Sequence, residues 1–493
     1  MSRFLIIFFA LAGILSVTSR AATEPPGVIT VSNRAELDTA ITALSNTATD
    51  AKIVMRPGHY GHVTVAPSVF VGNKGTVTFT SEDPAKMAQM TLTLGGLDGG
   101  KQGRLVFDQI DFFESYDTFM KAYPDVKGAT VTSTNFAIIR LVSPVDVTIR
   151  RSRIRSDMLP SYDTSLGAKY REAKQAKHPN GSFLFIKATE ALGNVDGLVI
   201  EDCEISDIFY GLLLRGNNII CRRNTFHDIW CDMHDLFAPS TNVLIEDTYA
   251  YNIVGDTIHP DFIQIYTRGK PYKGIKNLTF RRNVVNAGPK SAFVEHTETK
   301  PQFGVDASRL TLQGFRVEGS LEGCENWTVQ DNVFGGVTSS AIFLPIVVPN
   351  STILRNTIAP MFRNGSNNRV ATTIRVTFQG GSGSVIAENV GAGLGVLVKE
   401  PAGVEVRGNV GGFNASSVES VGEYFVGPSF ELSAMTSKEV MLSAYRPKPG
   451  GPLDSAGDAA PKAGAIGKTL QGPPVDWSQN PPISAPLSAN SGN

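Results

Sequence analysis

Two neighbouring stretches of the chain concentrate side chains that exchange protons. The first reads HDIWCDMHD at 227–235, and the second reads NIVGDTIHPDFIQIY at 252–266. Imidazole, carboxylate and phenol groups are the usual general acids and bases of enzymes, and such groups gathered in a cleft are site candidates. The catalytic candidates here are His234, His259 and Tyr266, and the residues expected to orient them or to bind substrate are Asp235, Asp261, Gln264 and Arg268.

Short apolar strands add cationic residues to this group. Aligned by their apolar positions, FLFIK, GLLLR, DLFAP and FIQIY end on Lys187, Arg215, Pro239 and Tyr266. FAIIR extends this column with Arg140, and either His296 from AFVEH or Glu318 from GFRVE continues it at the other end. Because side chains alternate across a strand, we expect one outward-facing column of polar groups that can bind a linear polymer.

The elements that position these residues repeat one short phrase. It reads VTIRRSRI at 147–154, LVIEDCEI at 198–205, IICRRNTF at 219–226 and LTFRRNVV at 278–285. Self-similarity at a spacing of about 20–50 residues indicates a solenoid. The apolar residues lie two apart, which predicts short strands with one face inward and parallel coils about 4.8 Å apart. A recurring asparagine is expected to form an internal hydrogen-bonded ladder; its members are Asn224, Asn283, Asn332, Asn356, Asn389 and Asn409.

The ends of the repeat region set the expected domain boundaries. Asn33 followed by Glu36 is a capping-box pattern, and the apolar spacing after it predicts a short helix that covers the first coil. The β-helix domain is expected over 22–445, with insertions at 155–181, which includes a basic helix, and at 298–312. A Pro-, Gly- and Ala-rich tail follows at 446–493.

The N-terminal 21 residues have the pattern of a secretory signal peptide: Arg3, an apolar run, and small residues before the cleavage point. We therefore expect an exported protein, periplasmic or extracellular, with no membrane segment after cleavage. The 493 residues carry a formal net charge of -1, so no nucleic-acid partner is expected. A monomer is expected.

Four cysteines remain in this exported chain. Cys221 and Cys203 occupy inward packing positions of the repeat, so free buried thiols are expected for them; the other two are Cys231 and Cys324. Their spacing does not match a zinc site. The residues by themselves predict no cofactor.

Over about residues 29–410 the chain resembles exported right-handed parallel β-helix proteins of the pectate-lyase-like superfamily. The resemblance is carried by the AELDTAI…IVMRPGHY opening, the V-x-I-x-x-N-x-I coils and HPDFIQ. It implies an all-β, single-stranded right-handed parallel β-helix. It also implies action on acidic polysaccharides such as alginate, pectate and glycosaminoglycans.

Within that superfamily, alginate lyases similar to chondroitinase B use a Lys base and an Arg acid, with Ca²⁺ on the substrate carboxylate. Lys187 and Arg215 resemble this pair, so the resemblance allows Ca²⁺, although the acidic calcium-ligand motif of those enzymes is not found in this chain. Other lyases use Tyr and His, which fits Tyr266 with His234 or His259.

The first hypothesis is β-elimination on a uronate polysaccharide, alginate-like as first choice. A cation, Arg215 with Arg140, would neutralise the substrate carboxylate and stabilise the enolate-like charge. Lys187, His259 or an ionised Tyr266 would take the proton, and Tyr266 or a histidine would protonate the leaving group. The alternatives are a mannuronan-type epimerase, an inverting glycosidase using Asp235 and Asp261, and a non-catalytic glycan-binding β-helix.

Overall fold

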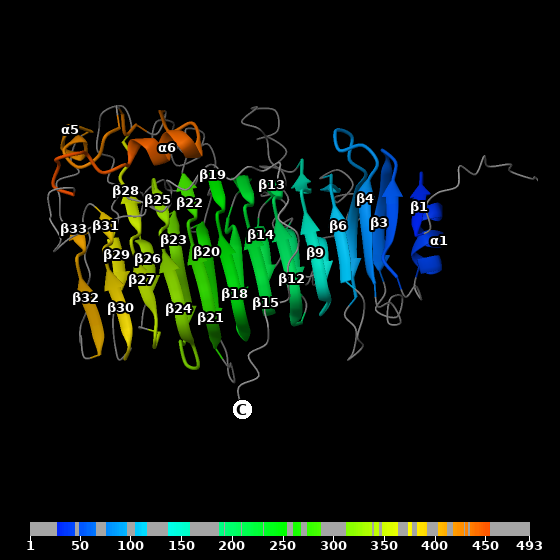
Figure 1. Cartoon of the computed structure of the whole chain (residues 1–493), viewed down its shortest axis with the longest axis horizontal. Coiled ribbons are helices and arrows are strands. Elements are labelled where there is room, and N and C mark those ends of the chain that lie inside the picture. Colours follow the sequence, from blue (N-terminus) through cyan, green and yellow to red (C-terminus); the bar gives the residue numbers. More distant parts are fainter. Residues whose placement is uncertain are drawn as a thin grey trace, which may run out of the picture.

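The protein is a right-handed parallel β-helix, as the computed structural model shows (Figure 1). Each full coil contributes one strand to each of three faces, here called sheets 1, 2 and 3. The structure describes residues 27–44, 49–65, 75–95, 104–115, 137–157, 187–191, 193–208, 210–229, 231–253, 260–267, 274–286, 312–337, 340–344, 348–362, 373–376, 382–391, 403–411, 418–427, 429–431 and 434–453. All pairings between the named strands are parallel, as the sequence predicts.

Sheet 1 runs the whole length of the stack. Its strands are, in spatial order, β1 (Val28–Val31), β2 (Ala51–Met55), β4 (Thr76–Ser81), β6 (Arg104–Asp108), β9 (Val145–Arg150), β12 (Val195–Glu201), β15 (Gly216–Arg222), β18 (Ser240–Glu246), β21 (Ile275–Arg281), β24 (Glu325–Gln330), β27 (Thr352–Leu354), β30 (Ser384–Ala387) and β32 (Val404–Arg407).

Sheet 2 is built from shorter strands that follow sheet 1 after one tight turn. They are β7 (Asp111–Glu114), β10 (Arg153–Ser156), β13 (Glu204–Ile208), β16 (Thr225–Ile229), β19 (Tyr249–Ile253), β22 (Val284–Asn286), β25 (Val333–Gly335), β28 (Thr357–Ala359), β31 (Val390–Gly391) and β33 (Val410–Gly411).

Sheet 3 carries the candidate site and joins sheet 2 through β5. Its strands are β3 (His59–Val65), β5 (Gln89–Leu94), β8 (Ala137–Leu141), β11 (Lys187–Ala191), β14 (Tyr210–Leu214), β17 (His234–Phe237), β20 (Asp261–Thr267), β23 (Gln313–Gly319), β26 (Ser340–Leu344) and β29 (Thr373–Val376).

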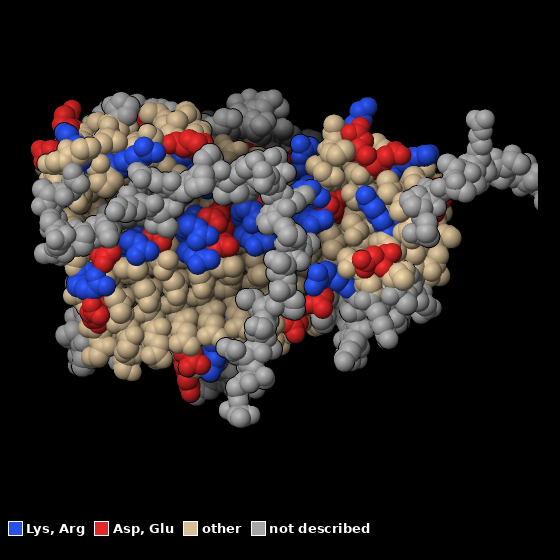
Figure 2. All heavy atoms as spheres, in the orientation of Figure 1, with Lys and Arg blue, Asp and Glu red and all other residues tan. Residues whose placement is uncertain are grey.

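The turn between sheets 1 and 2 explains the charged pairs of the repeat phrase. One residue of each turn adopts a left-handed conformation, as at Asp202 and Arg223 with φ of 55° and 54°, and residues of opposite charge stack in successive coils. Arg223 bonds to Asp202 at 2.7 Å, and Arg282 bonds to Asp247 at 2.7 Å. Figure 2 shows these residues as a band of alternating blue and red along the stack. This alternation of charge between successive coils disfavours pairing that is shifted by one coil, because side chains of like charge would then be neighbours.

The predicted asparagine ladder is confirmed. Asn332 Nδ2 donates to Asn356 Oδ1 at 2.9 Å, and Asn356 Nδ2 donates to Asn389 Oδ1 at 2.9 Å. Each amide also reaches a backbone carbonyl of the preceding coil, so these buried polar groups are satisfied. Cys203 takes the ladder position above Asn224, whose Oδ1 accepts from the Cys203 backbone amide at 3.0 Å.

The predicted capping helix is also present. Helix α1 (Arg34–Leu44) lies beside β1 at the N-terminal end of the stack (Figure 1) and buries Leu37 and Ile41. Asn33 Oδ1 accepts from the Glu36 amide at 3.0 Å, as a capping box requires, while the Glu36 carboxylate accepts from the amide of Ser32, one residue before the cap, at 2.7 Å.

A C-terminal segment, which the sequence patterns did not predict, packs on sheet 2. It contains α5 (Val418–Gly422) and α6 (Lys438–Ala444), which lie along the far half of the stack (Figure 1). Asn286 Nδ2 donates to the Met435 carbonyl at 2.8 Å. A Cβ at Gly335 would come within 2.2 Å of Met441, so glycine there permits the close approach.

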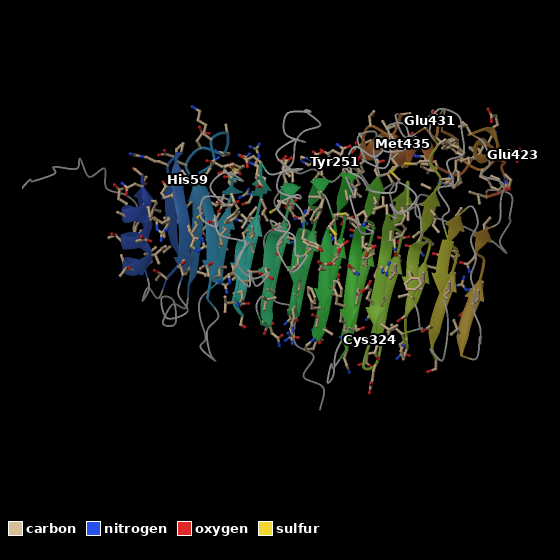
Figure 3. All side chains as sticks on the ribbon, turned by 180° about the vertical axis from the view of Figure 1, so that it is seen from behind. His59, Tyr251, Cys324, Glu423, Glu431 and Met435 are labelled. Atoms are coloured by element: carbon tan, nitrogen blue, oxygen red, sulfur yellow. The ribbon has the colours of Figure 1, made fainter. Side chains whose placement is uncertain are left out.

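The cysteine prediction for Cys203 and Cys221 is confirmed: all four cysteines are buried and free. Cys324 lies at the opposite edge of the stack from Tyr251 in Figure 3. No described helix is long and apolar enough to cross a membrane. The signal peptide, the basic helix, most of the second insertion and the tail after residue 453 lie outside the described residues, so those boundaries stay predictions.

Candidate active site

The strand pairing of sheet 3 sets which outward side chains lie level with one another. Leu213 pairs with Asp235, Asp235 with Gln264, and Gln264 with Arg316. Two residues further along the strands, Phe237 pairs with Tyr266 and Tyr266 with Glu318. Neighbouring strands lie about 4.8 Å apart, so the two rows lie side by side across β14, β17, β20 and β23. They are polar except for Leu213 and Phe237, and Asp235 and Gln264 within them are buried.

Part of the predicted column is correct. Arg215 follows Leu214, which pairs with Leu236, so Arg215 is level with Phe237 and Tyr266. Glu318 continues the row beyond Tyr266, which settles the choice between Glu318 and His296. GLLLR, FIQIY and GFRVE therefore align as predicted.

The rest of the predicted column is wrong. Lys187 pairs with Tyr210 at the start of β14, five residues before Arg215, and Arg140 is level with Glu190 and Leu213. In the coil of β17, Phe237 takes the place predicted for Pro239. The described strand is KATEA, in which Thr189 is 0% exposed and pairs with Leu212, whereas residues 183–186 of FLFIK lie outside the described residues.

His234 is also placed differently from the prediction. It is 0% exposed and its ring lies 4.7 Å from that of Phe226 and 5.4 Å from that of Phe262. Nδ1 donates to the Phe262 carbonyl at 3.1 Å. Burial lowers the pKa of His234 to about 4, so this histidine is a neutral core residue and does not reach a substrate on the outer face.

Three aspartates come together where β17 and β20 begin. Asp232 is level with Asp261, and the Asp261 backbone amide donates to Asp232 Oδ1 at 2.7 Å. Asp235 follows Asp232 by three residues and pairs with Gln264. All three aspartates are at most 3% exposed. Sequence analysis proposed Asp235 and Asp261; Asp232 was missed, although it stands within the HDIWCDMHD stretch.

The pKa values of two of these carboxyls are raised well above 3.8. Burial is the main cause for Asp232, and the charge of Asp261 adds to it. Burial is also the main cause for Asp261, where Arg316 opposes the rise while Asp235 and Glu318 add to it. Crowded, desolvated carboxyls do not all ionise together, so this cluster can hold a proton at a pH where an exposed aspartate cannot.

Tyr266 is held in place beside this cluster. Its hydroxyl donates to Gln264 Oε1 at 2.5 Å, and its ring stacks on Phe237 at 4.9 Å with an interplanar angle of 8°. Burial raises the pKa of Tyr266, and the charge of Asp235 adds to the rise. The phenol therefore keeps its proton, which suits a proton donor and does not suit an ionised base.

Cations border the aspartates on both sides. Arg316 bonds to Glu318 at 2.9 Å and lies 5.9 Å from the Phe343 ring, whereas Arg215 and Arg140 lie on earlier coils. The Nε atoms of these three arginines are buried and make no hydrogen bond. A buried donor without an acceptor is costly, so a ligand carboxylate would recover that loss.

Tyr210 and Cys231 belong to the same site and were missed as site residues. The side chains of Tyr210 and Cys231 hydrogen-bond to each other, and burial raises the pKa of both. His259, Arg268, His296 and the side chain of Lys187 lie outside the described residues. Among the described residues, no group of three His, Cys, Asp or Glu side chains is arranged to hold a metal ion.

No model of a known protein family and no curated protein matches the chain. Among solved structures, the PL6 family polysaccharide lyase of Pseudopedobacter saltans is 13% identical, with 78% of this chain and 92% of that chain covered and a TM-score of 0.40. A mannuronic acid specific family 6 lyase from human gut microbiota is 12% identical, with 77% and 82% covered and a TM-score of 0.36.

A tailspike protein of an E. coli bacteriophage is similar at 12% identity, with 76% of this chain and 71% of that chain covered and a TM-score of 0.34. These likenesses concern architecture, which the strand pairing of this chain establishes independently. No residue role is transferred from them.

Proposed function

We propose that the protein is a polysaccharide lyase that cleaves a uronate-containing polymer by β-elimination on the outer face of sheet 3. The observation that carries the proposal is the combination of Arg140, Arg215 and Arg316, with unbonded Nε atoms, and a protonated Tyr266 in the same polar surface. Cations can bind the acidic polymer, and the phenol can supply a proton.

The elimination needs one group to withdraw charge from the substrate carboxylate. Arg316 and Arg215 are assigned this role because Arg316 lies on the coil after that of Tyr266, beside Gln264, and Arg215 lies two coils before it, level with Tyr266. A guanidinium can contact a carboxylate with two hydrogen bonds, and it stabilises the enolate-like charge that develops as the neighbouring C–H bond breaks. Arg140 binds a more distant uronate of the polymer.

The proton steps are then divided between two residues. His259, two residues before Asp261 in the chain, takes the proton from the carbon next to the carboxylate. The electron pair of that C–H bond forms the new double bond, and the bond to the leaving oxygen breaks. Tyr266 gives its proton to that oxygen, and Asp235 and Asp261 shape the hydrogen bonds around both groups.

Glycoside hydrolysis is the second candidate, favoured by the aspartate cluster. Asp261, whose pKa is raised by burial, would act as general acid, and Asp235 would act as base or nucleophile. Inverting glycosidases place their two carboxyls about 6.5–9.5 Å apart and retaining enzymes place them about 5–5.5 Å apart. A neutral acid beside a second carboxylate is the arrangement that such enzymes use.

One assay separates these functions. The protein is incubated with alginate, polygalacturonate, glucuronan and hyaluronan, and the ultraviolet absorbance of the unsaturated uronate product is followed. New reducing ends without absorbance indicate hydrolysis, and a changed uronate composition without cleavage indicates epimerisation. Binding of a polymer without any change in it indicates a binding protein. Parallel reactions with Ca²⁺ and with a chelator test whether the ion is needed on the substrate carboxylate.

We also propose that the protein is exported, because residues 1–21 have the signal-peptide pattern. Expression of the full chain in a bacterium, followed by N-terminal sequencing of the periplasmic and secreted protein, tests this. A mature chain that begins at Ala22 agrees with the proposal, and an uncleaved cytoplasmic chain contradicts it.

A further inference from the structure

At the C-terminal end of the stack, one inward position of the last described coil is exposed. Val406 of β32 pairs with Ile386, and Ile386 pairs with Ile353, so Val406 continues a column of inward-facing residues. Ile386 and Ile353 are 1% and 3% exposed, whereas Val406 is 43% exposed. A core position is therefore in contact with solvent in the last coil.

The opposite end of the stack shows how such a position is normally covered. There α1 lies beside β1 and buries Leu37 and Ile41 to 0% and 4% exposure (Figure 1). Terminal repeats of a solenoid need a cover because each coil buries its apolar face only against a neighbour. The exposed Val406 indicates that the C-terminal coil is completed by a further element.

The edge of β32 is complementary to itself. Among the strands that the structure describes, β32 is the last of sheet 1, and no described strand pairs with its outer row of backbone groups. Glu405 and Arg407 flank Val406 and are 56% and 54% exposed, and within one protomer Arg407 bonds to Glu405 at 2.5 Å and to Glu388 at 2.6 Å. Pairing with a second copy would exchange the contact with Glu405 for one between subunits. When two copies of this strand pair antiparallel with Val406 opposite Val406, each Glu405 faces Arg407 of the partner subunit.

We propose that this edge is the interface of an end-to-end homodimer, in which β32 pairs antiparallel with β32 of a second copy about a two-fold axis at Val406. The pairing satisfies the backbone groups of both edges, makes two cross-strand ion pairs, and encloses both copies of Val406. It is an isologous interface, the commonest kind in soluble dimers. The candidate active site on β20 lies several coils away from β32 (Figure 1), so dimerisation is independent of the proposed catalysis.

Analytical ultracentrifugation of the full chain, from low to high micromolar concentration, tests the proposal. The wild type is expected to shift from monomer to dimer. Arg407→Glu makes like charges face each other twice and is expected to weaken association by about tenfold or more. The double variant Glu405→Arg, Arg407→Glu exchanges both charges and is expected to restore it.

Two further variants separate the interface from folding. Lys276→Glu disrupts the 2.6 Å ion pair of Lys276 with Glu325 on sheet 1, away from the last coil, and is expected to leave association unchanged. Val406→Lys places two ammonium groups on the axis and is expected to give a folded monomer by circular dichroism.

Two results would overturn the proposal. A wild type that stays monomeric throughout the concentration range shows that the last coil is covered by the chain itself, and a shift in the thermal unfolding of a 1–453 truncation would identify the tail as the cover. A dimer whose dissociation constant is unchanged by both the charge reversal and Val406→Lys uses a different surface. Either result excludes the β32 interface whether or not the enzyme is active.

Discussion

The backbone amide of Asp261 donates a 2.7 Å hydrogen bond to Oδ1 of Asp232 on the preceding coil. The two residues are 29 positions apart in the chain, and only the coiling of the β-helix brings them level. Their carboxyls lie beside Asp235, Tyr210 and Tyr266 in a buried cluster, and desolvation raises the pKa values of Asp232 and Asp261. This contact opposes the rise in the pKa of Asp232, which burial and the charge of Asp261 cause.

We expect Asp261→Asn to stabilise the protein at neutral pH. The folded-state pKa of Asp261 is raised above its ordinary 3.8, so its contribution to stability is fully present below 3.8 and is lost as the pH rises through the folded pKa. Asparagine does not titrate and keeps the shape. Thermal unfolding at several pH values should show an advantage that grows above pH 4 to about 1 kcal/mol or more at pH 7.

The matched control is Asp38→Asn, because Asp38 is 52% exposed in a surface pair with Arg34. Its effect should be small at every pH. An Asp261→Asn effect that is flat between pH 4 and pH 8 would show that Asp261 is ionised in the fold, contrary to the assignment.

We expect Tyr266→Phe to lower kcat by about 10²–10⁴-fold, the usual contribution of a general acid. The ring stack on Phe237 is retained, so the loss in stability should be about 1 kcal/mol, from the missing hydrogen bond to Gln264. Steady-state kinetics and thermal unfolding measure the two effects. Tyr251→Phe is the control, since Tyr251 lies on sheet 2, stacked on His227 (Figure 3); equal losses in both variants would remove Tyr266 from the mechanism.

We expect Arg316→Gln to raise KM for an acidic polymer and to reduce the salt dependence of binding. The charge of Arg316 opposes the rise in the pKa of Asp261, so its loss raises the pKa of that carboxyl further and moves the alkaline limb of the pH–rate profile upward. Arg355→Gln, which breaks the 2.7 Å pair with Asp331 away from sheet 3, is the control. An unchanged KM with Arg316→Gln would mean that this guanidinium does not contact the polymer.

We expect His234→Leu to keep kcat within a few-fold of the wild type. The ring is enclosed by Phe226 and Phe262, and Leu212 and Ile263 flank it in the same inward column, so leucine fits the site. A loss comparable with that of Tyr266→Phe would restore His234 to the mechanism and contradict the structural placement.

The coil architecture could be predicted from the sequence because its signals are local. The V-x-I-x-x-N-x-I phrase gives the strand alternation, the turn and the ladder asparagine in one segment, and the hydrogen bonds of Asn332, Asn356 and Asn389 follow from it. The Asn33–Glu36 cap is local as well. The C-terminal helices were missed because tertiary contacts, which no local pattern shows, hold the segment in place. It packs against Gly335 and Asn286, which lie on distant coils.

The register of the site was harder to predict, because its errors come from polar residues that face inward. His234 is 0% exposed, yet it was expected on the outer face, and DLFAP was placed so that Pro239 instead of Phe237 came level with Tyr266. Lys187 was placed level with Arg215 but pairs with Tyr210. Where inward residues are apolar, as Ile263 and Ile265 are, the alignment of FIQIY with GLLLR and GFRVE was correct. Asp232 joins the site only through this corrected register.

The most direct test of the central claim is the ultraviolet absorbance of an alginate or other uronate-polymer digest, compared between the wild type and Tyr266→Phe. The account predicts that the wild type produces unsaturated uronate ends on at least one acidic polymer and that Tyr266→Phe does so at least about a hundredfold more slowly. The account would be contradicted if the wild type produced new reducing ends without any ultraviolet absorbance and the Tyr266→Phe variant were equally active.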